Sequence, residues 1–292
     1  MQGALEQAWQ AIQQAPDDVS RLEVLADLLL QEESAFGELL RLELERERVG
    51  GTRLTPRIER ERRAIASGVR HEIADADWLR GFVRSTRGEG STVLRRVLAH
   101  PAFRLLRVVE WGFGDGDSLD AIEASLGELP PTLVELRLTG RNLESGALAW
   151  PSQLRRLQTM VANLPISLAE VTSPELRALH FHPAGVDAAE FVRGLEQVWF
   201  PKLAELSLTL EPTTERWPAS FLAGDRTPAL KRLWLQGALM PEHVEELASS
   251  GLLRGLEELS LDVQHLPQFD MILSDTADRF EHLKRFRRPA PR

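Results

Sequence analysis

The sequence predicts an α/β fold in which a helical N-terminal domain is followed by an irregular repeat solenoid with a curved parallel sheet. From about residue 103 one pattern recurs: an apolar residue, two variable residues, a second apolar residue, one variable residue and a third apolar residue. The first seventy residues instead carry apolar residues at helical spacing. A regular period is typical of solenoids. We therefore divide the 292 residues into a helical domain, 1–72, a junction that caps the array, 73–102, and the array itself, 103–292.

Apolar spacing and end signals predict four helices in the N-terminal domain. The first carries apolar residues at helical spacing and ends at Pro16, and Asp17 or Asp18 can cap the second. The third is expected over 35–49, ending at two glycines, and the fourth from Pro56 to about residue 71. The alternating arginines and glutamates of the last two helices, Glu43 among them, are expected on solvated faces.

The junction is predicted to contain one strand and one helix. Residues 78–83 have the composition of a short strand. Ser91 can cap a helix that ends before Pro101, and this helix would cover the open apolar end of the array.

The repeated pattern gives the expected strands of the array. Its copies begin at 103, 133, 154, 176, 203, 230, 256 and 283, often two residues after a proline, and the separations range from 21 to 30 residues. Amphipathic helices fit between strands in the longer units, over 118–126, 186–195 and 242–250. The shorter units between 133 and 176 leave room for a turn of 3₁₀ helix or an extended segment.

The spacing of Leu230, Leu233 and Leu235 and its copies resembles the leucine-rich repeat family, whose motif is L-x-x-L-x-L-x-x-N/C-x-L. The asparagine or cysteine position departs from that motif, and Ala238 occupies it in this copy. The resemblance implies an irregular leucine-rich-repeat array that binds proteins. Residues 11–27 and 37–42 resemble the bacterial repeat-companion domain, which implies a place in front of such an array and no established catalytic role.

Alternation along each strand predicts the residues that face away from the core. The second and third apolar residues of each copy point inward, so the residues between and beside them point outward along the concave sheet face. Trp234 beside Arg232 is a typical interface anchor. We expect protein binding by seven outward residues: Arg156, Gln158, His180, His182, Arg232, Trp234 and Gln236. The same rule places Leu105, Val109 and Met160 outward.

A metal site is the alternative use of the two histidines. His180 and His182 lie two apart on one strand face, and a site would need a further ligand such as Glu205, His243 or Asp262. We predict no metal, no cofactor and no catalytic residue, since no nucleotide-binding or hydrolase motif is present. The acidic segment 114–118 has the wrong spacing for a calcium loop and is expected to be a turn before a capped helix.

Composition limits the other classes of function. The absence of cysteine excludes disulfides and a cysteine nucleophile and suits the cytoplasm, which is the expected location. No secretory signal or membrane span is expected. The net charge of -9 argues against nucleic-acid binding, although the C-terminal segment from residue 279 is locally basic.

These observations predict a non-catalytic module whose partner is another protein. Two alternatives are a regulatory or effector-like enzyme component with an unrecognised active site, and an immunity or antitoxin-like inhibitor. The sequence indicates neither the identity of the partner nor the oligomeric state.

Overall fold

The chain has a mixed α/β fold that divides into two compact units. A computed structural model describes residues 2–50, 52–69, 74–140, 159–162, 168, 171, 173–182, 188–210, 215–263 and 267–287. Unit 1 comprises Met1–Gly112 with Glu128–Leu133, and unit 2 comprises Phe113–Gly127 with Val134–Arg292. No helix in these described ranges is both long enough and apolar enough to cross a membrane.

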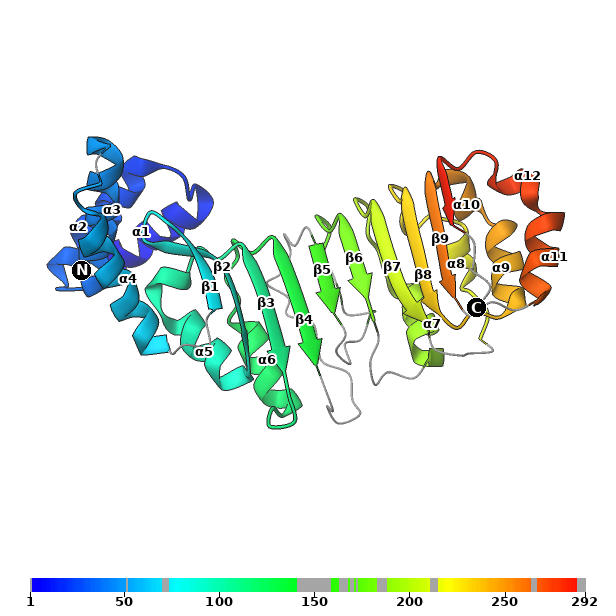
Figure 1. Cartoon of the computed structure of the whole chain (residues 1–292), viewed down its shortest axis with the longest axis horizontal. Helices are drawn as coiled ribbons and strands as arrows, with labels where there is room; N and C mark the ends of the chain where they lie inside the picture. The colour runs from blue at the N-terminus through cyan, green and yellow to red at the C-terminus, as the bar shows by residue number, and fades with distance from the viewer. Residues whose placement is uncertain are drawn as a thin grey trace. The chain divides into compact units, whose positions relative to one another are not determined.

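Unit 1 begins with helices α1 (Gln2–Gln14), α2 (Val19–Gln31), α3 (Ala35–Val49) and α4 (Thr55–Val69) (Figure 1). They confirm the helices expected from apolar spacing. Asp18 caps α2, because its side chain accepts hydrogen bonds from the backbone N–H groups of Ser20 and Arg21. The third helix ends at Gly50, which has the left-handed φ of 67° that glycine adopts without strain.

A hairpin follows the helices, so the single strand expected over 78–83 is wrong. Strand β1 (Ala74–Leu79) pairs antiparallel with β2 (Phe82–Glu89). Arg80 and Gly81 form the turn between them, with φ values of 51° and 80°. Positive φ at both positions gives the backbone twist that a two-residue hairpin turn requires.

The rest of unit 1 joins this hairpin to a parallel strand. Helix α5 (Ser91–Ala99) and the 3₁₀ turn η1 (Pro101–Phe103) lead into β3 (Val108–Phe113), which pairs parallel with β2. Ser91 is the first residue of α5 and is buried, and Gly90 occupies the cap position, so the expected serine cap is wrong.

Aromatic rings hold the core of unit 1 together. Phe36 of α3 stacks on Trp9 of α1 with ring centroids 6.3 Å apart, and it meets the edge of Phe82 of β2 at 5.2 Å. His100 packs edge-on against Phe36 at 6.3 Å and Phe103 at 6.1 Å. Helices α1 and α3, the hairpin and the 3₁₀ turn therefore share one aromatic cluster.

Glu43 is buried in unit 1, which corrects the expectation of a solvated side chain. It forms ion pairs with Arg46 of its own helix, at 2.7 Å, and with Arg62 of α4. Burying a carboxylate is costly unless cations compensate it, so this residue links α3 to α4 through its charge. Helical periodicity alone placed it among exposed charges, since it does not report where the next helix packs.

The sheet of unit 2 is parallel, and its strands neighbour one another in sequence order (Figure 1). The strands are β4 (Glu135–Gly140), β5 (Thr159–Ala162), β6 (Ala178–Phe181), β7 (Glu205–Leu210), β8 (Arg232–Gly237), β9 (Glu258–Val263) and β10 (Arg285–Arg287). The register aligns Leu206, Leu233, Leu259 and Phe286. Equivalent positions of successive copies therefore lie side by side.

The helices of unit 2 are α6 (Leu119–Gly127), α7 (Ala188–Gln197), α8 (Ala219–Leu222), α9 (Pro241–Ala248), α10 (Gly251–Gly255), α11 (Pro267–Asp275) and α12 (Ala277–Phe280). The three expected helices, 118–126, 186–195 and 242–250, match α6, α7 and α9 to within two residues at each end. The turn expected before α6 is also confirmed. Asp117 accepts from the backbone N–H of Gly114 at 3.0 Å, and Ser118 accepts from that of Ala121 at 3.3 Å.

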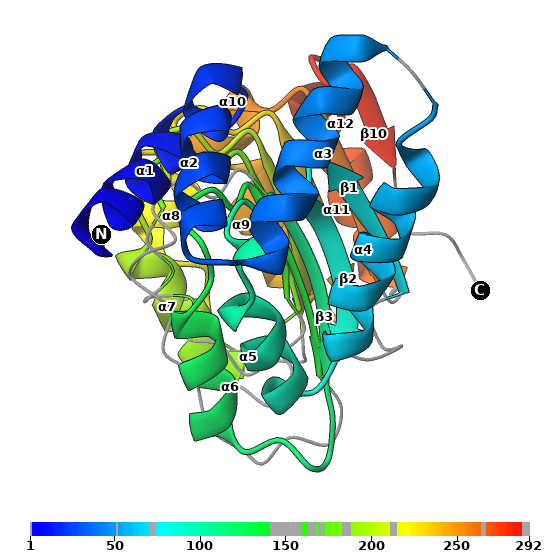
Figure 2. The same cartoon turned by 90° about the vertical axis from the view of Figure 1, so that its left-hand side faces the viewer.

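The two faces of the unit 2 sheet differ in polarity. The second and third apolar residues of the copies are buried, as Leu206, Leu208, Leu233 and Leu235 show. On that side, Phe181 of β6 stacks on Phe191 of α7 with centroids 5.6 Å apart. Figure 2 shows α7 and α8 on one side of these strands. The opposite face carries the residues that alternate with the leucines.

Two copies of the pattern are out of phase with the expectation. In β3, Val109 and Trp111 are buried, so the inward residues are Leu106, Val109 and Trp111. The expected set Phe103, Leu106 and Val108 starts three residues early, because the 3₁₀ turn holds Phe103 in the aromatic cluster. Leu105 and Val109 are buried, and their outward assignment is wrong.

The copy at β5 is also displaced. In the register of β5, Met160 pairs with Leu136 of β4 and with Leu179 of β6, the second apolar positions of their copies, so the phase of this copy differs from the expected one. Arg156 and Gln158 lie outside the described residues. A one-residue change of register exchanges the two faces of a strand, and irregular spacing before this strand conceals its phase in the sequence.

Candidate binding surface

The outward positions of three neighbouring strands bring together five of the expected binding residues. His180 lies on β6 and His182 directly follows it, while Arg232, Trp234 and Gln236 alternate along β8. The outward residues of β7 lie between the two sets, because His180 pairs with Ser207 and Ser207 with Trp234. We call the surface made by His180, His182, Glu205, Ser207, Thr209, Arg232, Trp234 and Gln236 the β6–β8 face.

The centre of this face is a pair of stacked rings. Trp234 and His180 stack with centroids 5.9 Å apart and ring planes inclined by 19°, although a whole strand separates their backbones. Ser207 lies between them in the register and is only 4% exposed. Its small side chain leaves space above β7, so the two rings lean together over it. Trp234 is half-buried as a result and keeps part of its ring on the surface.

A row of charges borders the stack on one side. Arg232 of β8 forms an ion pair with Glu205 of β7, and Glu135 of β4, level with them in the register, pairs at 2.6 Å with Arg137, which is level with His180. These are cross-strand or same-strand pairs in which each cation meets a carboxylate. The guanidinium that the sequence places beside Trp234 is thus already neutralised by a neighbour.

A row of hydrogen bonds borders the stack on the other side. Nδ1 of His182 is bonded to Oγ1 of Thr209, which in turn donates to Oε1 of Gln236 at 3.4 Å. Since the amide oxygen can only accept, the threonine hydroxyl is assigned as its donor, and His182 as the donor to the hydroxyl. The three side chains are therefore oriented by one another across β6, β7 and β8.

The surroundings of both histidines favour the neutral imidazole, because they lower the pKa of each ring. Partial burial is the main reason that the pKa of His180 lies below its ordinary value of 6.5, with Arg137 lowering it further and Glu205 opposing the shift. Burial also lowers the pKa of His182, and the neighbouring His180 adds to the effect. A neutral imidazole can stack on Trp234 without the cost of desolvating a charge.

Ser207 and Thr209 were not among the expected binding residues. Alternation places both on the outward face, but it gives no reason to single them out. The signal that could have found Ser207 is a small residue aligned between His180 and Trp234 once the copies are superposed.

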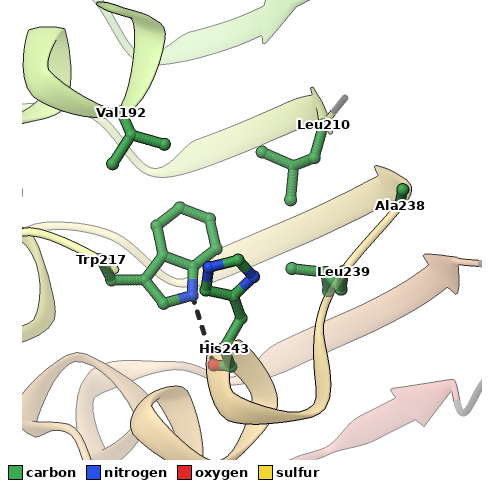
Figure 3. A pocket seen from close by; sticks show the side chains of 6 residues that line it. All are labelled: Val192, Leu210, Trp217, Ala238, Leu239 and His243. Carbon is green, nitrogen blue, oxygen red and sulfur yellow. Dashed lines mark hydrogen bonds between the residues drawn. The ribbon is translucent and has the colours of Figure 1, made fainter. Parts of the chain in front are cut away.

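His243 lies away from this surface, on the helix side of the sheet. It belongs to α9 and lines a small cavity of 10 Å³, room for about one water molecule, together with Val192, Leu210, Trp217, Ala238 and Leu239 (Figure 3). Its Nε2 is bonded to the backbone oxygen of Glu215 at 2.7 Å, and its Nδ1 accepts from the backbone N–H of Met240 at 3.2 Å. Both ring nitrogens of His243 therefore form hydrogen bonds with backbone groups of the same unit.

Among the residues that the structure describes, no further ligand is placed beside the two histidines of the β6–β8 face. Within the part of the chain that the structure describes, no three histidine, aspartate or glutamate residues are placed to hold a metal ion. Nδ1 of His182 is engaged by Thr209, and His180 is stacked on Trp234. The arrangement is suited to contact through rings and hydrogen bonds.

Comparison with solved structures shows distant likeness in three dimensions. No family model and no curated protein matches the sequence. A crystal structure of a protein from Bacteroides fragilis is similar to this chain with a TM-score of 0.44 and 18% sequence identity. The similarity covers 70% of this chain and 58% of the other, so the chain spans less than two thirds of that protein's length.

Proposed function

We propose that unit 2 is a leucine-rich-repeat array that binds another protein through the β6–β8 face, without catalysis. The observation that carries the proposal is the half-buried Trp234, stacked on His180 at the centre of a polar surface. Support for the repeat assignment comes from parallel strands in sequence order whose leucines align in register.

The chemistry of this face suits recognition of a folded partner. Tryptophan and arginine are the residues that most often dominate interface energies, and here they stand on adjacent outward positions of one strand. Arg232 keeps its charge paired with Glu205, so covering it leaves no isolated cation. The ring stack and the hydrogen bonds already fix these side chains, so they lose less conformational entropy when a partner binds.

The test is capture of partners from an extract of the cells that make the protein. Wild-type protein, Trp234→Ala and Trp199→Ala are immobilised at equal amounts, and recovered proteins are quantified by mass spectrometry. Trp199 is a matched control because it is 54% exposed in the same unit but precedes β7, away from the β6–β8 face.

We expect the partner to be depleted by about thirtyfold with Trp234→Ala, since loss of an interface anchor costs about 2 kcal/mol. The Trp199→Ala bait should recover it at wild-type yield. Thermal unfolding of each bait verifies that the variants are folded. Equal recovery by all three baits would show that this face is not the binding surface.

A further inference from the structure

One backbone hydrogen bond recurs where neighbouring parallel segments come together. In unit 2 the N–H of Lys284 donates to the carbonyl of Glu257 at 2.8 Å, and the N–H of Glu257 donates to the carbonyl of Lys231 at 2.7 Å. In unit 1 the N–H of Arg107, just before β3, donates to the carbonyl of Arg84 of β2 at 2.8 Å. Arg84 and Arg107 therefore stand in the same backbone relation as Glu257 and Lys284.

In unit 2 this relation brings side chains of opposite charge together. Nζ of Lys284 lies 2.6 Å from the carboxylate of Glu257, and Nζ of Lys231 lies 3.9 Å from it. The corresponding pair in unit 1 is arginine beside arginine. Like charges on neighbouring strands repel, so this place lacks the anion that unit 2 supplies from its own chain.

One carboxylate compensates the two arginines in part. Asp17, in the loop before α2, lies 3.5 Å from Arg84, and its side chain is 67% exposed. An ion pair so open to water is weak. Glu47 of α3 is held instead by two nitrogens of Arg80. In the ranges that the structure describes, no carboxylate forms an ion pair with the half-buried Arg107.

A third arginine lies on the same side of β2. The guanidinium of Arg104 lies 4.6 Å from the centre of the Trp9 ring. Trp9 meets the edge of Phe82, which is two residues before Arg84 and so on the same face of the strand. The group contains three cations and one carboxylate, namely Arg84, Arg104, Arg107 and Asp17. It therefore carries an excess of two positive charges.

We propose that Arg84 and Arg107 bind the phosphate group of a small ligand, either free phosphate or a phosphate monoester, with Arg104 adding to the attraction. A phosphate group close to its dianionic form offsets the excess charge, and its oxygens accept from the planar forks of two guanidinium groups at once. A single carboxylate would leave part of the excess. The site belongs to unit 1 and is independent of the β6–β8 face.

The test begins with binding of small anions to the full chain. Inorganic phosphate, glycerol phosphate and acetate are titrated by calorimetry at the same ionic strength, which is held with sodium chloride. We expect both phosphates to bind at least about tenfold more tightly than acetate, because acetate has one charge and two oxygens. Tighter binding of glycerol phosphate than of inorganic phosphate would identify an ester as the ligand, and the reverse would identify the free anion.

Neutral variants test the two arginines. Arg84→Gln and Arg107→Gln each remove one guanidinium and should weaken the binding of inorganic phosphate at least about tenfold. Arg41→Gln is the matched control, since it removes an exposed arginine of unit 1 that pairs with Glu38 at 3.1 Å. It should leave the binding unchanged.

Charge reversal separates anion binding from a structural role. Arg107→Glu gives the pair the carboxylate that Glu257 supplies in unit 2. Without phosphate it should raise the midpoint of thermal unfolding by about 1–3 °C, because repulsion becomes attraction. An arginine that only supports the fold would instead lower the midpoint when replaced.

The same variant should no longer respond to phosphate. Phosphate should raise the midpoint of the wild type above its value in chloride of equal ionic strength, and it should not raise that of Arg107→Glu. Failure of both phosphates to bind, binding no tighter than that of acetate, or full binding by Arg107→Gln would each overturn the proposal.

Discussion

At the scale of single residues, Arg80 combines an unfavourable backbone with favourable side-chain contacts. Its φ of 51° lies in the left-handed region. Its guanidinium donates to both carboxylate oxygens of Glu47, at 2.8 and 2.7 Å, and to the carbonyl oxygen of Asp17 at 3.0 Å. These bonds lower the pKa of Glu47 and attach the hairpin tip to α3 and to the loop before α2. The side chain therefore holds a turn that glycine would form with less strain.

Two substitutions separate these effects. Arg80→Ala removes the contacts and keeps the strain, whereas Arg80→Gly removes both. We expect the alanine variant to unfold about 1 kcal/mol more easily than the glycine variant, measured by urea denaturation. The wild type should be more stable than either. Equal stability of the two variants would contradict the presence of backbone strain at this position.

His100 gives unit 1 a dependence on pH. Burial lowers its pKa below the ordinary value of 6.5, and its Nδ1 accepts from the backbone N–H of Ala102 at 3.2 Å. As the pH falls below that ordinary value, the unfolded chain binds a proton that the folded chain does not. The free energy of unfolding therefore decreases with falling pH until the folded histidine also titrates.

His100→Asn retains a side-chain oxygen that can accept from the same N–H but has no group that titrates in this range. We expect the variant to lose less unfolding free energy than the wild type when the pH is lowered from about 7.5 to about 5.5. Denaturant titrations of both proteins at the two values measure the difference. The other titrating groups are common to both proteins, so identical losses would rule out His100 as a contributor.

At the scale of elements, the close approach of neighbouring strands is visible at Gly237, the last residue of β8. Its φ is 94°, and a Cβ there would lie 2.3 Å from the carbonyl oxygen of Leu210 at the end of β7. The next residue, Ala238, donates its backbone N–H to that same oxygen at 2.9 Å. Glycine is thus required where β8 turns away from β7.

Gly237→Ala should destabilise the protein by about 2–4 kcal/mol, because the new methyl group meets backbone and the φ is unfavourable. Gly116→Ala is the control, since a Cβ at that position meets no atom within 4 Å. It should change stability by less than about 0.5 kcal/mol. Thermal unfolding of both variants measures the contrast, and equal midpoints would show that the strands can separate at little cost.

Local signals in the sequence were sufficient for most elements. Asp18 and Gly50 mark helix ends by their own chemistry, and the leucine spacing gives the strands from β6 onward with the correct faces. Contacts between distant segments could not be predicted from these local signals. Phe103 has the spacing of a strand residue but joins the aromatic cluster instead, and residues 78–83 have strand composition but contain a turn.

At the scale of the whole molecule, the candidate site shows the same contrast between local signals, which the sequence reveals, and contacts between distant segments, which it does not. Alternation places all eight residues of the β6–β8 face outward, because it depends only on the period of a strand, and five of them were expected to bind. The stack of His180 on Trp234 depends on three strands at once and on the small size of Ser207. The sequence therefore predicts which residues face outward, and the structure adds which of them act together.

The first residues of the last four strands, Glu205, Arg232, Glu258 and Arg285, lie side by side and alternate in charge. This alternation bears on how such a sheet changes when copies of the repeated pattern are gained or lost. Removing the one copy that contains β8, so that Glu205 became the neighbour of Glu258, would set carboxylate against carboxylate. Removing two would set Glu205 beside Arg285 and restore attraction. Gains and losses of copies in even numbers therefore preserve the pairing of opposite charges between neighbouring strands in this part of the molecule.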